Sequence, residues 1–198
     1  MKWPRPPPAE REKRRGVAGM VYAFKIAGAA VEAGGDLATV TAVAQKAADA
    51  CRSVGAALSS CTVPQAGKPT FHIAEDEMEM GMRIHGELGV WRGKLRPADV
   101  IASEMMDRLL ADMPLARGDR VSVMVNSLGA TPPEELYILY RFVKARLDGI
   151  GAVTVMPLVG RYATSMEMAG VSFTLLKLDA ELEGFLTAPC DCAFWRVG

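Results

Sequence analysis

The stretch from residue 121 to residue 155 constrains the fold most, because the spacing of its apolar residues changes twice. Val121, Val123 and Val125 alternate with other residues, which is the period of a β-strand. Further on, apolar residues recur at the i, i+3, i+4 and i+7 spacing of an amphipathic helix that ends at Gly149: Leu136, Leu139, Tyr140, Val143 and Leu147. Val153 and Val155 return to strand spacing. Strand, helix and strand in this order predict a parallel crossover unit, and so an α/β fold.

Two helices are predicted near the start of the chain. The first begins at Gly16, with Val17, Met20, Val21, Phe24 and Ile26 as apolar residues, and ends at Gly34-Gly35. Asp36 is placed to cap the second, whose predicted apolar face is made of small and medium residues: Leu37, Val40, Ala44, Ala47 and Cys51.

The rest of the chain supplies shorter elements. Residues 54–58 read as a strand and residues 59–70 as a loop rich in Ser, Pro, Gly and Lys. Pro97 opens a helix with Ile101, Met105 and Leu109 on one face, and Pro114 stops it. Residues 171–178 form a last apolar run, residues 179–186 a short helix, and the residues from Pro189 onward are expected to be irregular. With no internal repeat, the pattern predicts an α/β protein of two unequal lobes.

Charge and composition exclude several classes of function. Lys plus Arg and Asp plus Glu number 23 each, so no net positive field would attract a nucleic acid. No apolar run approaches the roughly 18 residues of a membrane span. The lead, Met1 to Arg15, is rich in proline and charge, which predicts disorder rather than a signal peptide. Four cysteines without metal-ligand spacing are typical of reduced thiols, and a cytoplasmic protein is expected.

Only two histidines, His72 and His85, are available for catalysis, and neither has a metal ligand at short spacing. Gly86 and Gly89 remove side-chain bulk beside His85, so its imidazole can meet a small ligand. By spacing alone, a structural or surface histidine is the more common explanation.

Three other features allow alternatives. Residues 126–131 could present backbone N–H groups to an anion, or form a tight turn in which Thr131-Pro132-Pro133-Glu134 acts as a capping box. The acidic residues 75–79 favour a solvated face over a magnesium site. Met78, Met80 and Met82 alternate as in a strand and are predicted to be core.

Several segments resemble, in order, the substrate-binding subunit of dihydroxyacetone kinases. They cover about residues 14–189 and are many enough to be specific. They comprise Arg15-Gly16-Val17-Ala18-Gly19, residues 57–64 with Gly67-Lys68-Pro69, Ile84-His85-Gly86-Glu87, residues 125–132 with Glu135-Leu136-Tyr137, and residues 164–170 with 174–179.

The resemblance implies a Dak1/DegV-like fold: a mixed sheet lobe with flanking helices plus part of a second α/β lobe. On that basis we divide the chain into four parts: a disordered lead (1–15), a remnant of the first lobe (16–52), the second, histidine-bearing lobe (53–178) and a tail (179–198).

The resemblance also implies chemistry. In that family the histidine of the Ile-His-Gly-Glu motif adds to the ketone of dihydroxyacetone, which assigns His85 as the covalent substrate anchor and His85 with Gly86 as the substrate-binding residues. The chain itself would bind no cofactor or metal. The phosphoryl donor would be ATP-magnesium, or ADP recharged by a phosphotransferase system, on a nucleotide-binding kinase subunit or domain, and the family implies a homodimer.

The chain departs from the family pattern in two ways. Arg83 stands where the family has glycine and Leu88 where it has proline, which changes the backbone restrictions around His85. The family's front region, with its glycine-rich substrate loop and acid/base histidine and aspartate, has no counterpart here. Three hypotheses follow: a kinase component that is inactive alone, a non-catalytic binding or regulatory protein, and a truncated reading frame.

Overall fold

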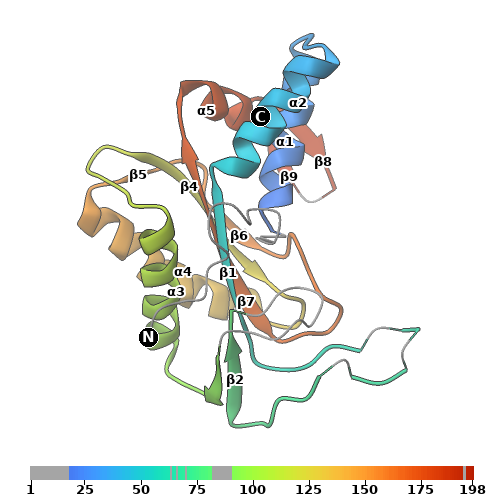
Figure 1. The fold of residues 1–198 in the computed structure, drawn as a ribbon, viewed down its shortest axis with the longest axis vertical. Helices are drawn as coiled ribbons and strands as arrows, with labels where there is room; N and C mark the ends of the chain where they lie inside the picture. Colours follow the sequence, from blue (N-terminus) through green and yellow to red (C-terminus); the bar gives the residue numbers. More distant parts are fainter. Residues whose placement is uncertain (1–17, 63, 66, 70, 82–90, 194) are drawn as a thin grey trace.

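A computed structural model describes residues 18–62, 64–65, 67–69, 71–81, 91–193 and 195–198 (Figure 1). The helices are α1 (Gly19–Glu32), α2 (Leu37–Asp49), α3 (Ala98–Asp112), α4 (Pro133–Ile150) and α5 (Ala180–Thr187). The strands are β1 (Cys51–Ala57), β2 (Glu77–Met80), β3 (Trp91–Lys94), β4 (Arg120–Ser127), β5 (Val153–Thr154), β6 (Leu158–Gly160), β7 (Gly170–Leu178), β8 (Cys190–Cys192) and β9 (Trp195–Val197).

One mixed sheet organises these elements. Its order is β3-β2-β1-β7-β4-β5, and β6 also pairs with β4. β4 is parallel to β5 and β6 but antiparallel to β7, which in turn is antiparallel to β1. The α/β prediction and the parallel crossover through α4 are therefore confirmed.

Helices cover both faces of the sheet (Figure 1). Val121, Val123 and Val125 of β4 join the core beneath α3 and α4, whereas Met124 joins the core shared by α1, α2 and α5. Successive strand residues point to opposite faces, and both faces are covered, so β4 and β7 are buried along almost their whole length.

The start of α4 differs from the prediction. Pro132 is the N-cap residue and no side chain caps the helix, so the predicted capping box is wrong. The Thr131 hydroxyl instead donates to the Gly170 carbonyl (2.8 Å) and accepts from the Gly170 amide (2.8 Å). The helix continues past Gly149 to Ile150, and its C-cap residue, Gly151, has the left-handed conformation that favours glycine (φ 81°).

The α1–α2 hairpin agrees with the prediction only in part. α1 ends just before Gly34-Gly35 as predicted, but α2 ends at Asp49, so Cys51, predicted on its apolar face, begins β1 instead. The Asp36 side chain accepts from the Thr39 amide (2.8 Å), so the predicted cap of α2 is confirmed. On the predicted apolar face of α2, Ala47 is buried as expected, but Leu37 is 84% exposed. Val43, which the prediction left out, is buried beside Ala47.

Two further predictions are corrected. The residues after Pro189 are not irregular, because β8 and β9 pair as an antiparallel hairpin, across which Asp191 and Arg196 form an exposed ion pair (2.6 Å). Within the acidic stretch, Glu79 is buried rather than solvated. Met78 and Met80 are fully buried as predicted, while Met82 and the lead lie outside the described residues.

In the part of the chain that the structure describes, no helix combines the length and the hydrophobicity needed to cross a membrane.

Candidate functional site: the anchor of the histidine segment

His85 and Gly86 belong to segment 82–90, which lies outside the described residues. The structure does describe both attachment points of that segment. Gly81 donates its amide to the Gly55 carbonyl of β1 (2.6 Å), and Met80 faces Trp91 in the β2–β3 ladder. The two attachment points therefore lie on neighbouring strands, at the last rung of a two-stranded stem.

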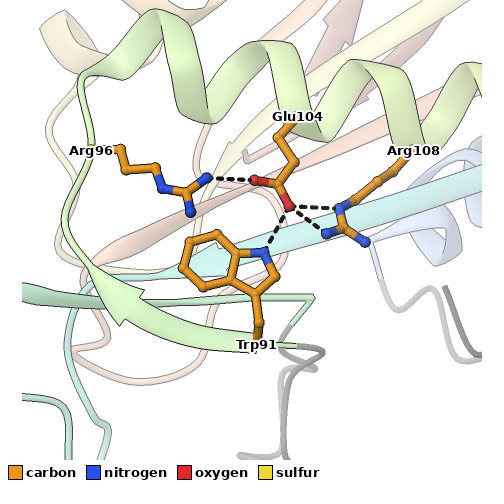
Figure 2. Close-up of polar contacts among 4 residues, drawn as sticks. All are labelled: Trp91, Arg96, Glu104 and Arg108. Atoms are coloured by element: carbon orange, nitrogen blue, oxygen red, sulfur yellow. Dashed lines mark hydrogen bonds and ion pairs between the residues drawn. The ribbon is translucent and has the colours of Figure 1, made fainter. Parts of the chain in front are cut away.

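Trp91, the first residue after the segment, is fixed to helix α3 through Glu104 (Figure 2). The indole N–H donates to Glu104 Oε1 (2.7 Å), and Arg96 Nη1 donates to Oε2 (3.1 Å). Arg108, one turn further along α3, donates to Oε1 through Nε (3.1 Å) and also through Nη2. One carboxylate thus joins the end of the segment, the start of α3 and the middle of α3.

Charge keeps this cluster together. Burial acts to raise the pKa of the Glu104 carboxyl, but hydrogen bonds from Arg108 and Trp91, with the charges of Arg108 and Arg96, outweigh it and lower the pKa below its usual value. The Arg96 guanidinium also lies over the Trp91 ring, 4.3 Å from its centroid, in a cation–π contact. Glu104 is therefore ionised at neutral pH and binds all three partners at once.

A second ion pair fixes the same stem from its other face. Arg92 of β3 donates through Nε (3.0 Å) and Nη2 (2.5 Å) to Oε2 of Glu79, whose residue is only 2% exposed. Its Nη1 donates to the carbonyl of His72 (2.6 Å). The second histidine thus contributes a backbone oxygen to the stem. Because a buried carboxylate without a partner is costly, this pairing holds β2 and β3 in register.

A cleft of about 720 Å³ borders the anchor, between β1 and α3. Arg52, Ser53 and Val54 line one side, and Glu104 and Arg108 lie among the α3 residues on the other. Its volume is in the usual range for small-ligand sites. Its charges are largely neutralised within the protein, as in the Arg52–Asp112 pair (3.1 Å), so the cleft has no strong charge of one sign with which to select an ion.

The turn at residues 126–131 offers little to an anion. Three of its backbone N–H groups are already used: Leu128 donates to Gly170 O (3.0 Å), Gly129 to Ser127 Oγ (3.2 Å) and Ala130 to Met168 O (3.0 Å). The tight-turn interpretation is therefore confirmed, apart from its capping box. Within the described ranges, no three potential metal ligands of the His, Cys, Asp or Glu type gather in one place.

Sequence reasoning missed Glu104, which organises the anchor. A signal was present: Glu104 and Arg108 have the i, i+4 spacing of a helical ion pair. The contribution of Trp91 and Arg96 depends on how β3 packs against α3, which no local pattern states.

Comparison with known proteins identifies the family to which the chain belongs. A family model described as the Dak1 domain matches residues 5–194. The chain belongs to the Dak1 family. It is 46% identical over 186 residues to the dihydroxyacetone-binding subunit of PTS-dependent dihydroxyacetone kinase 2 of Listeria innocua, a match covering 94% of this chain and 56% of that protein.

Two further Dak1 relatives widen the range of functions. L-erythrulose 1-kinase of Mycolicibacterium smegmatis is 44% identical over 196 residues, covering 96% of this chain and 34% of that enzyme. A solved dihydroxyacetone kinase operon co-activator superposes with a TM-score of 0.80 at 32% identity, covering 88% of this chain and 55% of that one. This chain therefore spans about half the length of the Listeria subunit and about a third of the erythrulose kinase. The resemblance carried by the motifs is confirmed at the level of the family.

Proposed function

We propose that the chain binds dihydroxyacetone or a related small ketose through a covalent hemiaminal on His85, so that the ketose can be phosphorylated. The observation that carries the proposal is the Ile84-His85-Gly86-Glu87 motif within a member of the Dak1 family. The Listeria relative is a dihydroxyacetone-binding subunit, which supports the same role for this chain.

The reaction at His85 is an addition in which every atom of the ketone is kept. A neutral imidazole nitrogen forms a bond to the carbonyl carbon, and the electron pair of the C=O π bond moves to oxygen. The other ring nitrogen gives up its proton, and the oxygen gains one to become a hydroxyl. Since no water leaves, the adduct adds the full mass of the ketone, unlike a lysine imine.

This chemistry selects ketones over polyols. Glycerol has no electrophilic carbon and cannot form the adduct, whereas dihydroxyacetone and erythrulose can. The erythrulose kinase among the relatives is consistent with a pocket for either ketose. Gly86 adds no side-chain bulk beside the reacting carbon.

The anchor supports the proposal physically. A covalent adduct requires the imidazole to be held where the ketone is bound, because misplacement costs rate steeply. The Trp91–Glu104 cluster and the Arg92–Glu79 pair fix the stem that carries the His85 segment. We further propose that the phosphoryl donor, ATP-magnesium or phosphotransferase-recharged ADP, lies on a nucleotide-binding partner, and that the chain functions as a homodimer.

Native mass spectrometry with dihydroxyacetone tests the proposal. The wild-type chain is expected to gain the mass of one dihydroxyacetone, and His85→Ala to gain none. His72→Ala is the matched control, since it removes the only other imidazole, and glycerol is the control ligand. Adduct formation by His85→Ala would contradict the assignment.

A regulatory binding protein is the second candidate, favoured by the likeness to the operon co-activator. If the regulatory protein also captures the ketose, the two candidates differ in turnover. Adding a nucleotide-binding kinase subunit with ATP-magnesium separates them. Formation of the ketose phosphate supports the kinase component, and capture without phosphorylation supports the regulatory protein.

A further inference from the structure

The β8–β9 hairpin presents two cysteine thiols on one face. Cys190 and Cys192 are two residues apart in β8, and side chains at that spacing in a strand point to the same side. Both thiols are free, and both donate to one acceptor, the Trp195 carbonyl oxygen of β9, at 3.8 Å for Cys190 and 3.3 Å for Cys192. The two sulfurs are therefore turned towards one point on the hairpin.

The strand keeps these two cysteines too far apart for a disulfide. Alternate residues of an extended strand are about 6.6 Å apart, since each residue advances about 3.3 Å. A disulfide needs β-carbons about 3.5–4.5 Å apart. Closing one would bend β8 and break its antiparallel pairing with β9, in which Cys190 faces Val197 and Cys192 faces Trp195. In the paired hairpin the two sulfurs are better placed to bind one ion between them than to bond to each other.

Helix α1 places a positive charge beside the cysteine pair. The hairpin lies next to α1 at one end of the molecule (Figure 1). Lys25 of α1 donates through Nζ to the carbonyls of Phe185 (3.0 Å) and Ala188 (2.7 Å), just before Cys190 in the chain. Burial lowers the pKa of the Lys25 ammonium, and its electrostatic interaction with Cys190 acts against this shift. An anionic complex formed by the cysteines would therefore lie close to a positive charge.

The number of ligands decides which ion the pair could hold. Among the residues that the structure describes, no third His, Cys, Asp or Glu side chain joins the two cysteines in a metal-binding group. Structural zinc sites need four protein ligands and catalytic ones three, so zinc is not expected here. Soft thiolate ligands favour Cu(I), an ion that accepts two thiolates in a nearly linear arrangement. We propose that Cys190 and Cys192 form a two-thiolate binding site for Cu(I).

Binding at this site changes no oxidation state. Each thiol releases one proton to the solvent, and each sulfur forms one bond to the same Cu(I) ion. Two thiolates and one Cu(I) carry a net charge of minus one, which the nearby Lys25 ammonium offsets. Cys192 is exposed, so the ion can reach the pair from solvent. The inference uses no residue of the ketose site, so a failure of the His85 assignment leaves it intact.

Anaerobic titration of the full chain with a Cu(I) acetonitrile complex, in competition with the chelator bicinchoninate, tests the site. The wild type is expected to bind one Cu(I) per chain. Cys190→Ser and Cys192→Ser should each weaken binding by at least about a hundredfold, because loss of even an outer-shell partner costs about 10–100-fold in metal affinity. Circular dichroism checks that both variants are folded.

Cys51→Ala is the matched control for these two variants. Burial raises the pKa of the Cys51 thiol to about 12, so this thiol stays protonated at neutral pH. Removing it should leave the affinity for Cu(I) unchanged. Zn(II) is the control ion and should bind far more weakly than Cu(I), because the pair offers it too few ligands.

Three outcomes would overturn the proposal. Unchanged Cu(I) affinity in the variant with both Cys190→Ser and Cys192→Ser would place the ion elsewhere. Loss of two hydrogens from the peptide that carries both cysteines, after the native chain is treated with oxidised glutathione, would show that β8 bends and that the pair is a redox site instead. X-ray absorption of the copper-loaded wild type needs no substitution: two sulfur neighbours are expected, and nitrogen neighbours would assign the ion to histidine.

Discussion

Two polar regions of this molecule are built in opposite ways. The loops at residues 126–131 and 163–170 are held mainly by neutral hydrogen bonds and by close contact between backbones, and Asn126 and Ser127 are completely buried. Charged groups act only at their edges, where Arg161 donates to the Gly129 carbonyl and Glu167 accepts from the Thr62 amide. The anchor beside segment 82–90 is held by charged side chains, and its central carboxylate, Glu104, keeps part of its surface in water. The first region resists any change of shape, whereas the second depends on protonation.

This difference distinguishes a structural site from the candidate functional site. In the buried loops the polar groups satisfy one another, which leaves little for a ligand to bind. In the anchor the charges surround the ends of the segment that carries His85, next to a cleft. The contrast predicts that variants in the loops act mainly on folding, and that variants in the anchor have smaller effects that change with pH.

The largest effect is expected from Gly129→Ala. A β-carbon at residue 129 would lie 2.2 Å from the Met166 carbonyl oxygen. The backbone φ of Gly129, 154°, also disfavours any side chain. Since backbone must move to relieve the clash, the free energy of unfolding should fall by more than about 3 kcal/mol, measured by urea denaturation. The matched control is Gly184→Ala in α5, where the added carbon meets nothing within 4 Å. An equal loss in both variants would show that close backbone contact does not hold these loops.

Asn126→Ala tests the neutral hydrogen bonds. The side-chain Nδ2 of Asn126 donates to the Ala163 carbonyl (2.7 Å). Its Oδ1 accepts from the backbone amides of Tyr162 (2.8 Å) and Ala163 (2.9 Å). Removing it leaves buried backbone groups without partners, so the cost should be about 2–4 kcal/mol in chemical denaturation. The loss should be the same at pH 7 and pH 5, because none of these groups is charged. A strongly pH-dependent loss would break the contrast with the anchor.

How much of this could be predicted from the sequence depends on the range of the interactions. The crossover through α4 and the helix opened by Pro97 follow local periodicity, and the structure has both. The family was identified from short ordered motifs and is confirmed by comparison. These features depend on neighbours in the sequence or on shared ancestry.

The features that were missed depend on contacts between distant segments. Thr131 satisfies Gly170 rather than capping α4, because the start of β7 lies against the turn. Leu37, at the start of α2, is exposed, whereas Val43 and Ala47 further along the helix are buried in one cluster with α1. Glu104 gains its role from Trp91, which reaches it only after β3 has paired with β2.

Glu104→Gln should have the smallest of the three effects and the clearest pH dependence. Glutamine keeps the shape but loses the charge that binds Arg96 and Arg108, so the cost at pH 7 should be about 1–2 kcal/mol. The folded-state pKa of Glu104 is lowered, so its contribution is present above the unfolded value of about 4.3 and is lost as pH falls through the folded pKa. Urea denaturation should therefore show the wild type and the variant converging below about pH 4.

An exposed ion pair between α3 and α4 is the control for that result. Arg141 donates to Asp99 of α3 (2.5 Å), with side chains that are 64% and 54% exposed. Solvent screens such a pair, so Arg141→Ala should change stability by no more than about 0.5 kcal/mol. A loss as large as that of Glu104→Gln would mean that any charge on α3 matters equally. A small loss would assign the effect to partial burial and to the convergence of Trp91, Arg96 and Arg108 on one carboxylate.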